Sequence, residues 1–397
     1  MTKTQTSEIG PLRNDPRGIA LLLAASLTVM AAATISPALP GLEQQFGDGP
    51  NAAYLIRALV PAPSLTVVFM AAFCGIVVDR IGRKPVLITG IALFALAGSA
   101  GLVLQDLGHL LASRLALGLA LAMVMTAQSA LVADYYAGAA LHRMTGAQVA
   151  ARNFGGFVFI MLAGGLASVA TRLPFLVYAL PAIFLPFFLK VIVEPARNKE
   201  APNRAAHDSP AGWWMPIALL AGGQMIITII FFTMPTQMPF FLSSQGYDNP
   251  ALTGAVLGCL MIAGGIAATF YQRLRATIGD IANRIAAIAL MATGFALLSG
   301  VPTVYAIFAG AAAIGAGYAL AIPGFIAVAL GVTPAQRRGT TAAMLTGSVF
   351  LGQFVSPFVS TPAIANWGWR GAGLGLAACL GMVALILMIA ALRKRRT

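Results

Sequence analysis

The sequence predicts an all-α polytopic membrane protein with twelve transmembrane helices. Three observations predict it: 59% of the 397 residues are hydrophobic, only 9% are charged, and the mean hydropathy is +0.85. Soluble domains carry about 25% charged residues, and disordered chains have low hydrophobicity. A membrane β-barrel is excluded because its strands alternate polar and apolar residues, whereas the apolar runs here are long and continuous.

Each predicted span is an apolar run of roughly 20 residues or more, which is the length that crosses a bilayer. The breaks between the runs are rich in Pro, Gly, Asn and Asp, the residues that favour turns. The spans are expected near residues 18–40, 53–77, 84–104, 108–133, 145–169, 174–194, 213–242, 251–272, 284–300, 303–329, 340–362 and 371–392.

The longest polar stretch, from Glu194 to Pro210, follows the sixth predicted span. It divides the chain into a first bundle (1–195), a linker (196–212) and a second bundle (213–397). The halves repeat each other weakly, because Arg143 precedes the fifth span as Arg338 precedes the eleventh. Parallel repeats of this kind place a substrate site between the halves, near the membrane midplane. We therefore expect two pseudo-symmetric six-helix bundles around a central site.

The net charge of +13 is distributed unevenly over the loops. One set of loops holds most of the lysines and arginines, whereas the loops on the other side of the membrane hold only two, Arg172 and Arg370. By the positive-inside rule, this asymmetry predicts a cell (inner) membrane protein with both termini in the cytoplasm, and it accounts for the charge without nucleic acid. The basic set comprises Lys3, Arg13, Arg17, Arg80, Arg83, Lys84, Arg143, Arg197, Lys199, Arg204, Arg273, Arg275, Arg284, Arg337, Arg338, Arg393, Lys394, Arg395 and Arg396.

One motif follows the second span: Gly75-Ile-Val-Val-Asp79-Arg80-Ile-Gly82-Arg83-Lys84. It closely resembles the G-x-x-x-D-R-x-G-R-[KR] signature of the major facilitator superfamily. The resemblance extends over the whole chain, because the number of spans, the inside termini and the central linker also match. It implies a monomeric secondary transporter that works by alternating access, with a small-molecule substrate and the lipid bilayer as its partners.

The resemblance assigns this motif a gating role. Gly75 would let the second span pack closely on a partner helix, and Asp79 would lie near the start of the eleventh span, where a carboxylate complements the helix dipole. Arg83 is expected to pair with Asp134. The alternative is that these charges only anchor the loop. The expected latch comprises Gly75, Asp79, Arg80, Gly82, Arg83, Lys84 and Asp134.

Two further patterns favour the drug/metabolite–proton antiporter branch, with protons as the coupling ion. Arg114-Leu-Ala-Leu-Gly118 in the fourth span resembles R-x-x-q-G, with Leu117 replacing the usual Gln. In the fifth span Gly164 and Gly165 match the end of the antiporter motif, whereas its Gly-Pro pair is missing.

The charged residues inside the spans indicate the charge of the substrate. None of the twelve acids or three histidines falls near the middle of a predicted span. Three arginines do lie within predicted spans: Arg57, Arg114 and Arg152. Arg152 is roughly two turns inside its span and is followed by Asn153. An intramembrane Arg is by default a functional hypothesis. If two of them face the cavity, it favours anionic or neutral substrates; the alternative is that each has a structural partner.

Five uncharged polar residues complete the candidate substrate site, because amides and a phenol can orient a ligand. They are Gln128, Gln224, Gln237, Tyr318 and Gln353. We expect no catalytic residues, metal or cofactor, since neither a phosphate-binding loop nor a Cys/His cluster is present in the sequence. The first interpretation is an efflux carrier for a drug or metabolite. The alternatives are an importer, facilitator or exchanger of an organic anion or sugar-like solute, and, more remotely, a membrane sensor.

Overall fold

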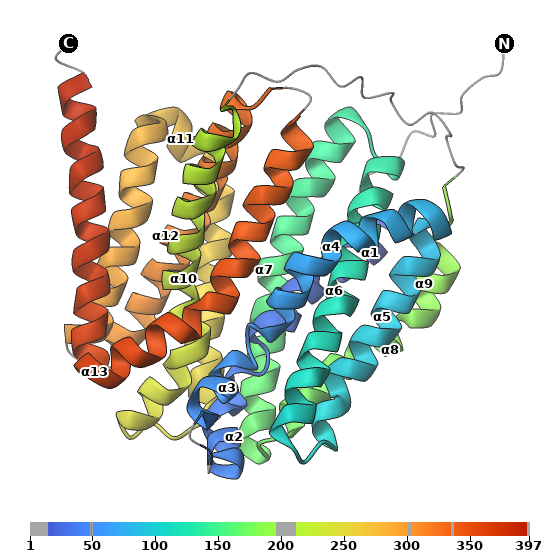
Figure 1. Ribbon diagram of the computed structural model, residues 1–397, viewed down its shortest axis with the longest axis horizontal. Helices are drawn as coiled ribbons and strands as arrows, with labels where there is room; N and C mark the ends of the chain where they lie inside the picture. The colour runs from blue at the N-terminus through green and yellow to red at the C-terminus, as the bar shows by residue number, and fades with distance from the viewer. Residues whose placement is uncertain are drawn as a thin grey trace.

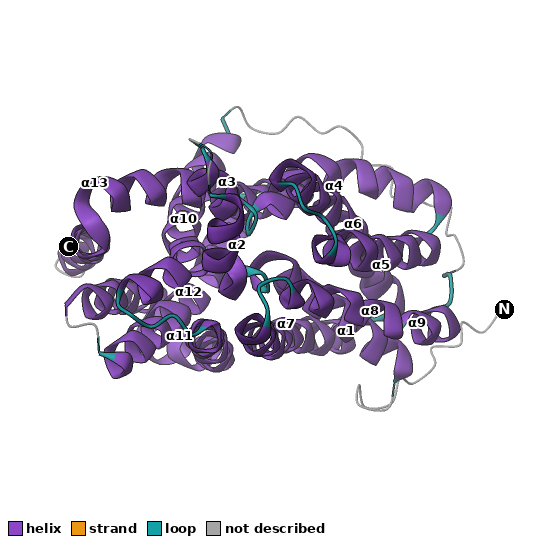
Figure 2. Cartoon of the chain, turned by 90° about the horizontal axis from the view of Figure 1, so that it is seen from below, coloured by secondary structure: helices purple, strands orange, loops and turns teal. Residues whose placement is uncertain are grey.

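The computed structural model describes residues 15–47, 49, 51–195, 212–300, 303–334 and 337–394. Throughout these residues the regular structure is helical (Figures 1 and 2). Ten helical segments among them are long and apolar enough to cross a membrane, and two of these contain 51 and 52 residues. Each of the two long segments is bent back at a glycine, so the count agrees with the twelve spans that the sequence predicts.

The first half of the chain is divided into more helical segments than the second. They are α1 (Pro16–Ala33), η2 (Ser36–Ala38), α2 (Leu39–Phe46), α3 (Ala52–Ala58), α4 (Ala62–Ile81), α5 (Arg83–Ser99), η3 (Ala100–Leu102), α6 (Leu107–Tyr135), α7 (Gly138–Val169), η4 (Leu173–Ala179), α8 (Leu180–Ile183) and α9 (Leu185–Val191). The second half forms α10 (Trp214–Ser244), α11 (Pro250–Gly300), α12 (Val304–Val332) and α13 (Arg338–Lys394).

Single glycines reverse the two long helices. Gly279 in α11 has φ 82° and ψ 167°, and Gly368 in α13 has φ 66° and ψ 170°. A positive φ in this range costs glycine little and strains other residues. Spans eight and nine, and spans eleven and twelve, are therefore joined by a turn at one residue, where the sequence predicted short loops.

Prolines break several of the predicted spans in the first bundle. The second span is divided into α3 and α4 at Leu59–Pro61, and the sixth into η4, α8 and α9, each of which has a proline in its first turn. Proline lacks the backbone N–H that would continue a preceding helix. The fifth span differs in another way, since α7 begins at Gly138, seven residues before the predicted start.

The helices gather into two bundles, α1–α9 and α10–α13, which meet along α7 and α11 (Figure 2). At this border Gly164 and Gly254 face each other. A Cβ built on Gly164 would lie 2.9 Å from the Cα of Gly254, so the two backbones touch. Small residues permit such close helix contacts in membranes. The predicted linker, residues 196–212, lies outside the described residues except for Gly212, and the domain boundaries stay a prediction.

The molecule has two distinct ends. We call the end where α4 meets α5 the basic end, because Arg80, Arg83 and Lys84 lie there, and the end formed by α2 and α3 the far end (Figure 1, top and bottom). Near the far end α4 is tied to the first part of α13, because Ser64 Oγ donates to Gln353 Oε1 at 2.5 Å. From there the two helices diverge toward the basic end (Figure 1).

Candidate functional site

A cavity of about 540 Å³ lies between the two bundles. Helices α1, α6 and α7 contribute one wall, and α10, α11, α12 and α13 contribute the other. Most of the lining is apolar, and the polar side chains come from both bundles. These polar residues are Thr28, Ser129, Arg152, Asn153, Gln224, Tyr318, Thr346 and Gln353.

The cavity is closed at the far end and open at the basic end. Toward the far end its lining residues Ala33 and Leu257 are 6% and 1% exposed. Toward the basic end Ala342 and Thr346 are exposed, and Ile326 is 40% exposed. A solute therefore reaches the cavity from the basic end in this conformation.

Arg152 lines this site from the middle of α7. It is the fifteenth of the 32 residues of α7, about 21 Å along the helix at 1.5 Å per residue. The sequence placed it only two turns inside its span, because the early start of α7 at Gly138 was not predicted. Its Nε is buried without a hydrogen-bond partner, and no carboxylate among the described residues forms an ion pair with it. The cavity thus contains one cation without a counter-charge.

Two more buried polar atoms of the cavity lack partners: Thr28 Oγ1 and Gln224 Oε1. The amide nitrogen of Gln224 donates to the carbonyl of Leu345 at 3.3 Å, which leaves its oxygen for another group. A buried polar atom without a partner costs about 1–3 kcal/mol. These atoms are therefore positioned to bind polar groups that enter the cavity.

The other predicted cavity residues have partners in the protein. Tyr318 stacks on Phe231 with ring centroids 3.9 Å apart, and its hydroxyl lies 3.3 Å from Thr228 Oγ1. Asn153 Nδ2 donates to the carbonyl of Val149 at 3.0 Å. With Gln353, which accepts from Ser64, these residues shape the walls of the site.

Arg114 lies outside the cavity, contrary to the expectation that two arginines would face it. It is completely buried inside the first bundle, and its Nη2 donates to the carbonyl of Gly98 at 2.6 Å. The guanidinium lies over the rings of Phe175 and Tyr178, 4.9 and 4.7 Å from their centroids. Gln128 is likewise not a lining residue, because its Nε2 donates to the carbonyl of Leu21 and joins α6 to α1. Both residues have structural partners.

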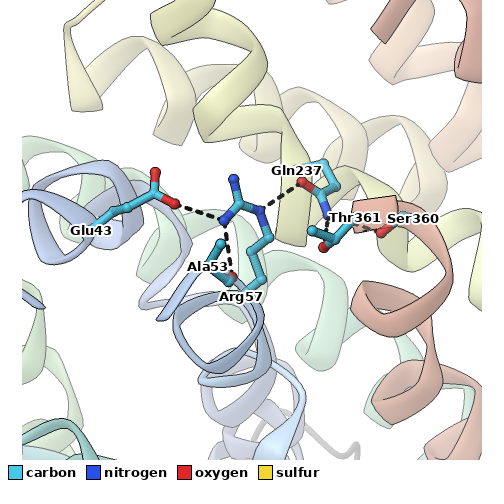
Figure 3. A network of polar contacts seen from close by, with 6 residues as sticks. All are labelled: Glu43, Ala53, Arg57, Gln237, Ser360 and Thr361. Carbon is cyan, nitrogen blue, oxygen red and sulfur yellow. Dashed lines mark hydrogen bonds and ion pairs between the residues drawn. The ribbon is translucent and has the colours of Figure 1, made fainter. Parts of the chain in front are cut away.

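Arg57 is also outside the cavity, in a network at the far end (Figure 3). Its Nη1 donates to Glu43 Oε1 at 2.8 Å and to the carbonyl of Ala53 at 2.9 Å, and its Nε donates to Gln237 Oε1 at 3.1 Å. The Arg57 side chain is 13% exposed, so it does not extend into solvent. The contact with Gln237 joins α3 of the first bundle to α10 of the second.

The far-end network continues into α13. Gln237 Nε2 donates to Ser360 Oγ and to Thr361 Oγ1, both at 2.9 Å (Figure 3). The guanidinium of Arg57 also lies 3.8 Å from the ring centroid of Phe240 in α10. We use the term far-end network for Glu43, Arg57, Gln237, Ser360 and Thr361. Together with a buried hydrogen bond from Ser36 to the Pro235 carbonyl, it closes this end.

At the basic end, Arg83 contacts the acid that the sequence suggested for it. Arg83 Nε lies 3.0 Å from Asp134 Oδ2, within the first bundle. The carboxylate of Glu194 accepts the backbone N–H groups of Arg83 and Lys84 at 2.8 and 2.7 Å. These N–H groups begin α5, just after Gly82 with φ 119°, so the acid complements the helix dipole.

Gly75 does not pack closely on the second bundle. A Cβ built on it would meet only Thr126 of its own bundle, at 4.0 Å. Asp79, near the end of the same helix, is exposed, as is Arg80. Gly75 therefore makes no close contact with the second bundle, and α4 and the first part of α13 diverge toward this end (Figure 1).

Sequence reasoning did not identify several residues of these sites, among them Glu43, Glu194 and Thr28. Glu43 and Glu194 were assigned to loops, and their partners Arg57 and Arg83 are 14 and 111 residues away in the chain. Thr28 was not distinguished from other hydroxyl residues within spans. The only sequence signal for Glu43 was its own charge, which lies on the same side of the membrane as Arg57.

Twelve apolar spans in two bundles around a cavity that is open at one end form the architecture of a secondary transporter. Residues 21–295 match the family model of the Major Facilitator Superfamily, so the chain belongs to this superfamily. No curated protein sequence matched the chain.

Solved transporter structures share the fold. A variant of the nucleoside transporter NupG has a TM-score of 0.76 at 15% identity, covering 95% of this chain and 99% of that one. The human organic anion transporter MFSD10 (TETRAN) has a TM-score of 0.69 at 17% identity, covering 96% and 100%. The inward-open xylose transporter XylE from E. coli has a TM-score of 0.75 at 15% identity, covering 94% and 95%. At these identities the likeness is one of fold.

Proposed function

We propose that the protein exports a small organic anion across the cytoplasmic membrane by alternating access, acting as a monomer. The basic end is taken as cytoplasmic, because Arg80, Arg83 and Lys84 lie there and Lys and Arg favour cytoplasmic loops. The described conformation then faces inward and is ready to take up a solute from the cytoplasm.

The observation that carries this proposal is the unpaired guanidinium of Arg152 in the cavity. Guanidinium forms bidentate, charge-assisted hydrogen bonds with carboxylates and phosphates. An apolar cavity wall strengthens these bonds because it lowers the local dielectric. An organic cation would instead be repelled, since the cavity lining includes no carboxylate.

Alternating access requires contacts that form and break between the bundles. At the far end Arg57 and Gln237 form such a contact, and opening toward the outside would break it. At the basic end the approach of Gly75 and Asp79 to the start of α13 would close the cavity. Since Arg83 and Asp134 both belong to the first bundle, their ion pair can persist in both states. Coupling to protons would then use the proton of the substrate itself or an acid at a helix end such as Asp134.

The test measures ligand-dependent thermal stabilisation of the purified protein with a panel of organic anions, cations and neutral solutes. A ligand that binds the folded state raises the melting temperature. Anions should stabilise the unaltered protein and Arg143→Ala, a matched control that removes an exposed charge from the same helix. They should not stabilise Arg152→Ala.

Transport in proteoliposomes with a stabilising anion then gives the direction and the dependence on a proton gradient. Stabilisation by cations alone, unchanged in Arg152→Ala, would refute an anion carrier. Net uptake into the cytoplasmic side would refute export and support an importer or exchanger.

A further inference from the structure

We propose that the ligand bridges the two bundles and has two different polar ends. Its anionic group binds Arg152 and Thr28 of the first bundle, and a neutral hydrogen-bond donor at its other end binds Gln224 of the second. This inference rests on the proposed function, because it takes the anion at Arg152 as given and specifies the rest of the molecule.

The anion subsite follows from the packing of α1 against α7. A Cβ built on Gly155 would lie 2.5 Å from Ser26 Cβ, and one built on Gly156 would lie 2.4 Å from Val29 Cγ1. Thr28 is therefore on the neighbouring helix, about one turn from Arg152. Both residues line the cavity, and both have a buried donor atom without a partner, Nε and Oγ1. Two donors, one of them charged, are suited to a carboxylate or phosphate oxygen.

The second subsite has the opposite polarity. Gln224 lies in α10 and is 1% exposed. The Leu345 carbonyl can only accept a hydrogen bond, so the amide nitrogen of Gln224 must face it, and the free atom in the cavity must be Oε1. This oxygen accepts a hydrogen bond from a hydroxyl or N–H group. It would repel a second carboxylate, whose oxygens are also acceptors.

The charges in the cavity decide which donor is suitable. An ammonium group is disfavoured because Arg152 repels it and the cavity lining includes no carboxylate to pair with it. A hydroxyl or an amide N–H has no such penalty. The rest of the cavity lining is mostly apolar and includes the stacked rings of Phe231 and Tyr318. The substrate class is therefore an organic acid with an apolar, preferably flat, middle and a neutral hydroxyl or amide at the end opposite the acid.

The test compares acids that differ only at the second end, on the unaltered protein. One series is 3-(4-hydroxyphenyl)propanoate, its O-methyl ether and 3-phenylpropanoate. A second series is the ω-hydroxyalkanoates of four to ten carbons with their unsubstituted and O-methyl counterparts. Affinity is measured by calorimetry. The best hydroxy acid should bind at least about tenfold more tightly than its ether, as expected for one buried hydrogen bond.

Two variants locate the effect. In Gln224→Met the preference for hydroxyl over ether should fall to about onefold, whereas the requirement for the anionic group should remain. In Arg152→Ala the binding of every acid should be lost. Melting temperatures measured without ligand report whether each variant is folded. The comparison of the ligand series on the unaltered protein does not depend on any variant being folded.

The outcomes distinguish this inference from the proposed function. If the hydroxy acids and their ethers bind equally but still require Arg152, the bridging ligand is refuted and the anion carrier stands. If a hydroxyl preference persists in Gln224→Met, the donor subsite lies elsewhere and the inference is again refuted. If acids bind independently of Arg152, or no acid in either series binds, both proposals fail.

Discussion

Replacing Arg57 by Leu should favour the conformation that is open at the far end. Leu retains apolar volume but removes the two contacts of Arg57 with the second bundle, the hydrogen bond to Gln237 and the cation–π contact with Phe240. Opening toward the outside must break both contacts in the unaltered protein. The variant lacks both contacts, so the closed state loses the part of its stability that they contribute.

The magnitude follows from these contacts. A hydrogen bond from a charged donor contributes about 1.5–3 kcal/mol, and a cation–π contact contributes about 0.5–2 kcal/mol. Because Arg57 retains some solvent exposure, we take the lower part of the combined range, about 2–3 kcal/mol. At 1.4 kcal/mol per factor of ten, the equilibrium should shift by about 30- to 150-fold. Glu43 belongs to the same bundle as Arg57 and only orients it, so Glu43→Gln should shift the equilibrium by less than about tenfold.

Cysteine accessibility provides the assay. Cys74, Cys259 and Cys379 are first replaced by Ser, and Ala33→Cys is added as a reporter, because Ala33 lines the closed end of the cavity. The reaction rate with a membrane-impermeant maleimide, applied from outside, should rise about 30- to 150-fold in Arg57→Leu. A second reporter, Ala342→Cys at the basic end, should become less reactive from the inside. Unchanged rates at both reporters would refute the view that the far-end network holds this end closed.

Three further outcomes are expected. Gly164→Leu should abolish transport, because its side chain would meet the backbone of α11 at 2.9 Å, whereas Gly165→Leu, which faces open space, should transport normally in the same proteoliposome assay. Arg114→Ala should lower the free energy of unfolding by about 2–4 kcal/mol, because packing is lost and the Gly98 carbonyl is left without its donor. The melting temperature should fall, whereas the increase in melting temperature caused by ligand should persist. Loss of the ligand-induced increase alone would contradict a structural role. Asp106 caps α6, and the backbone N–H of His109 that its carboxylate accepts lowers the pKa of Asp106. The cap therefore stabilises the fold fully above the ordinary aspartate pKa of about 4. This stabilisation is lost as the pH falls through the lowered pKa. The difference in melting temperature between the unaltered protein and Asp106→Ala should therefore be constant near neutral pH and shrink only in strong acid, and a difference that shrinks between pH 7 and pH 5 would contradict this assignment.

The general architecture could be read from the sequence because a bilayer requires long apolar runs and the loops differ in charge. The orientation of single residues could not. Helix α6 is apolar on nearly every side, so its sequence does not reveal whether Arg114 and Gln128 face the cavity or the interior of the first bundle. Arg152 was a candidate for the cavity, which it lines, but its position within the helix differs from the prediction because the polar residues after Gly138 were taken for a loop.

Contacts between distant segments were equally beyond the sequence. Glu194 caps α5 across 111 residues, and the far-end network joins Arg57 to Gln237 across 180. Pairing of Arg83 with Asp134 was suggested only by the family resemblance. The reversals at Gly279 and Gly368 were predicted as short loops, because the sequence does not reveal that one glycine with a positive φ makes the whole turn.

In the proposed export cycle, the single charge of Arg152 would also make transport sensitive to voltage. A positive site that alternates between the two sides of a membrane experiences the potential across it, about 2.3 kcal/mol per charge and 100 mV if the whole field is traversed. With a monovalent anion bound, the site is neutral and its reorientation is electrically silent. When the site is empty, a negative interior draws it back toward the cytoplasm. The membrane potential would then drive the return of the empty carrier, and each cycle would move one negative charge outward.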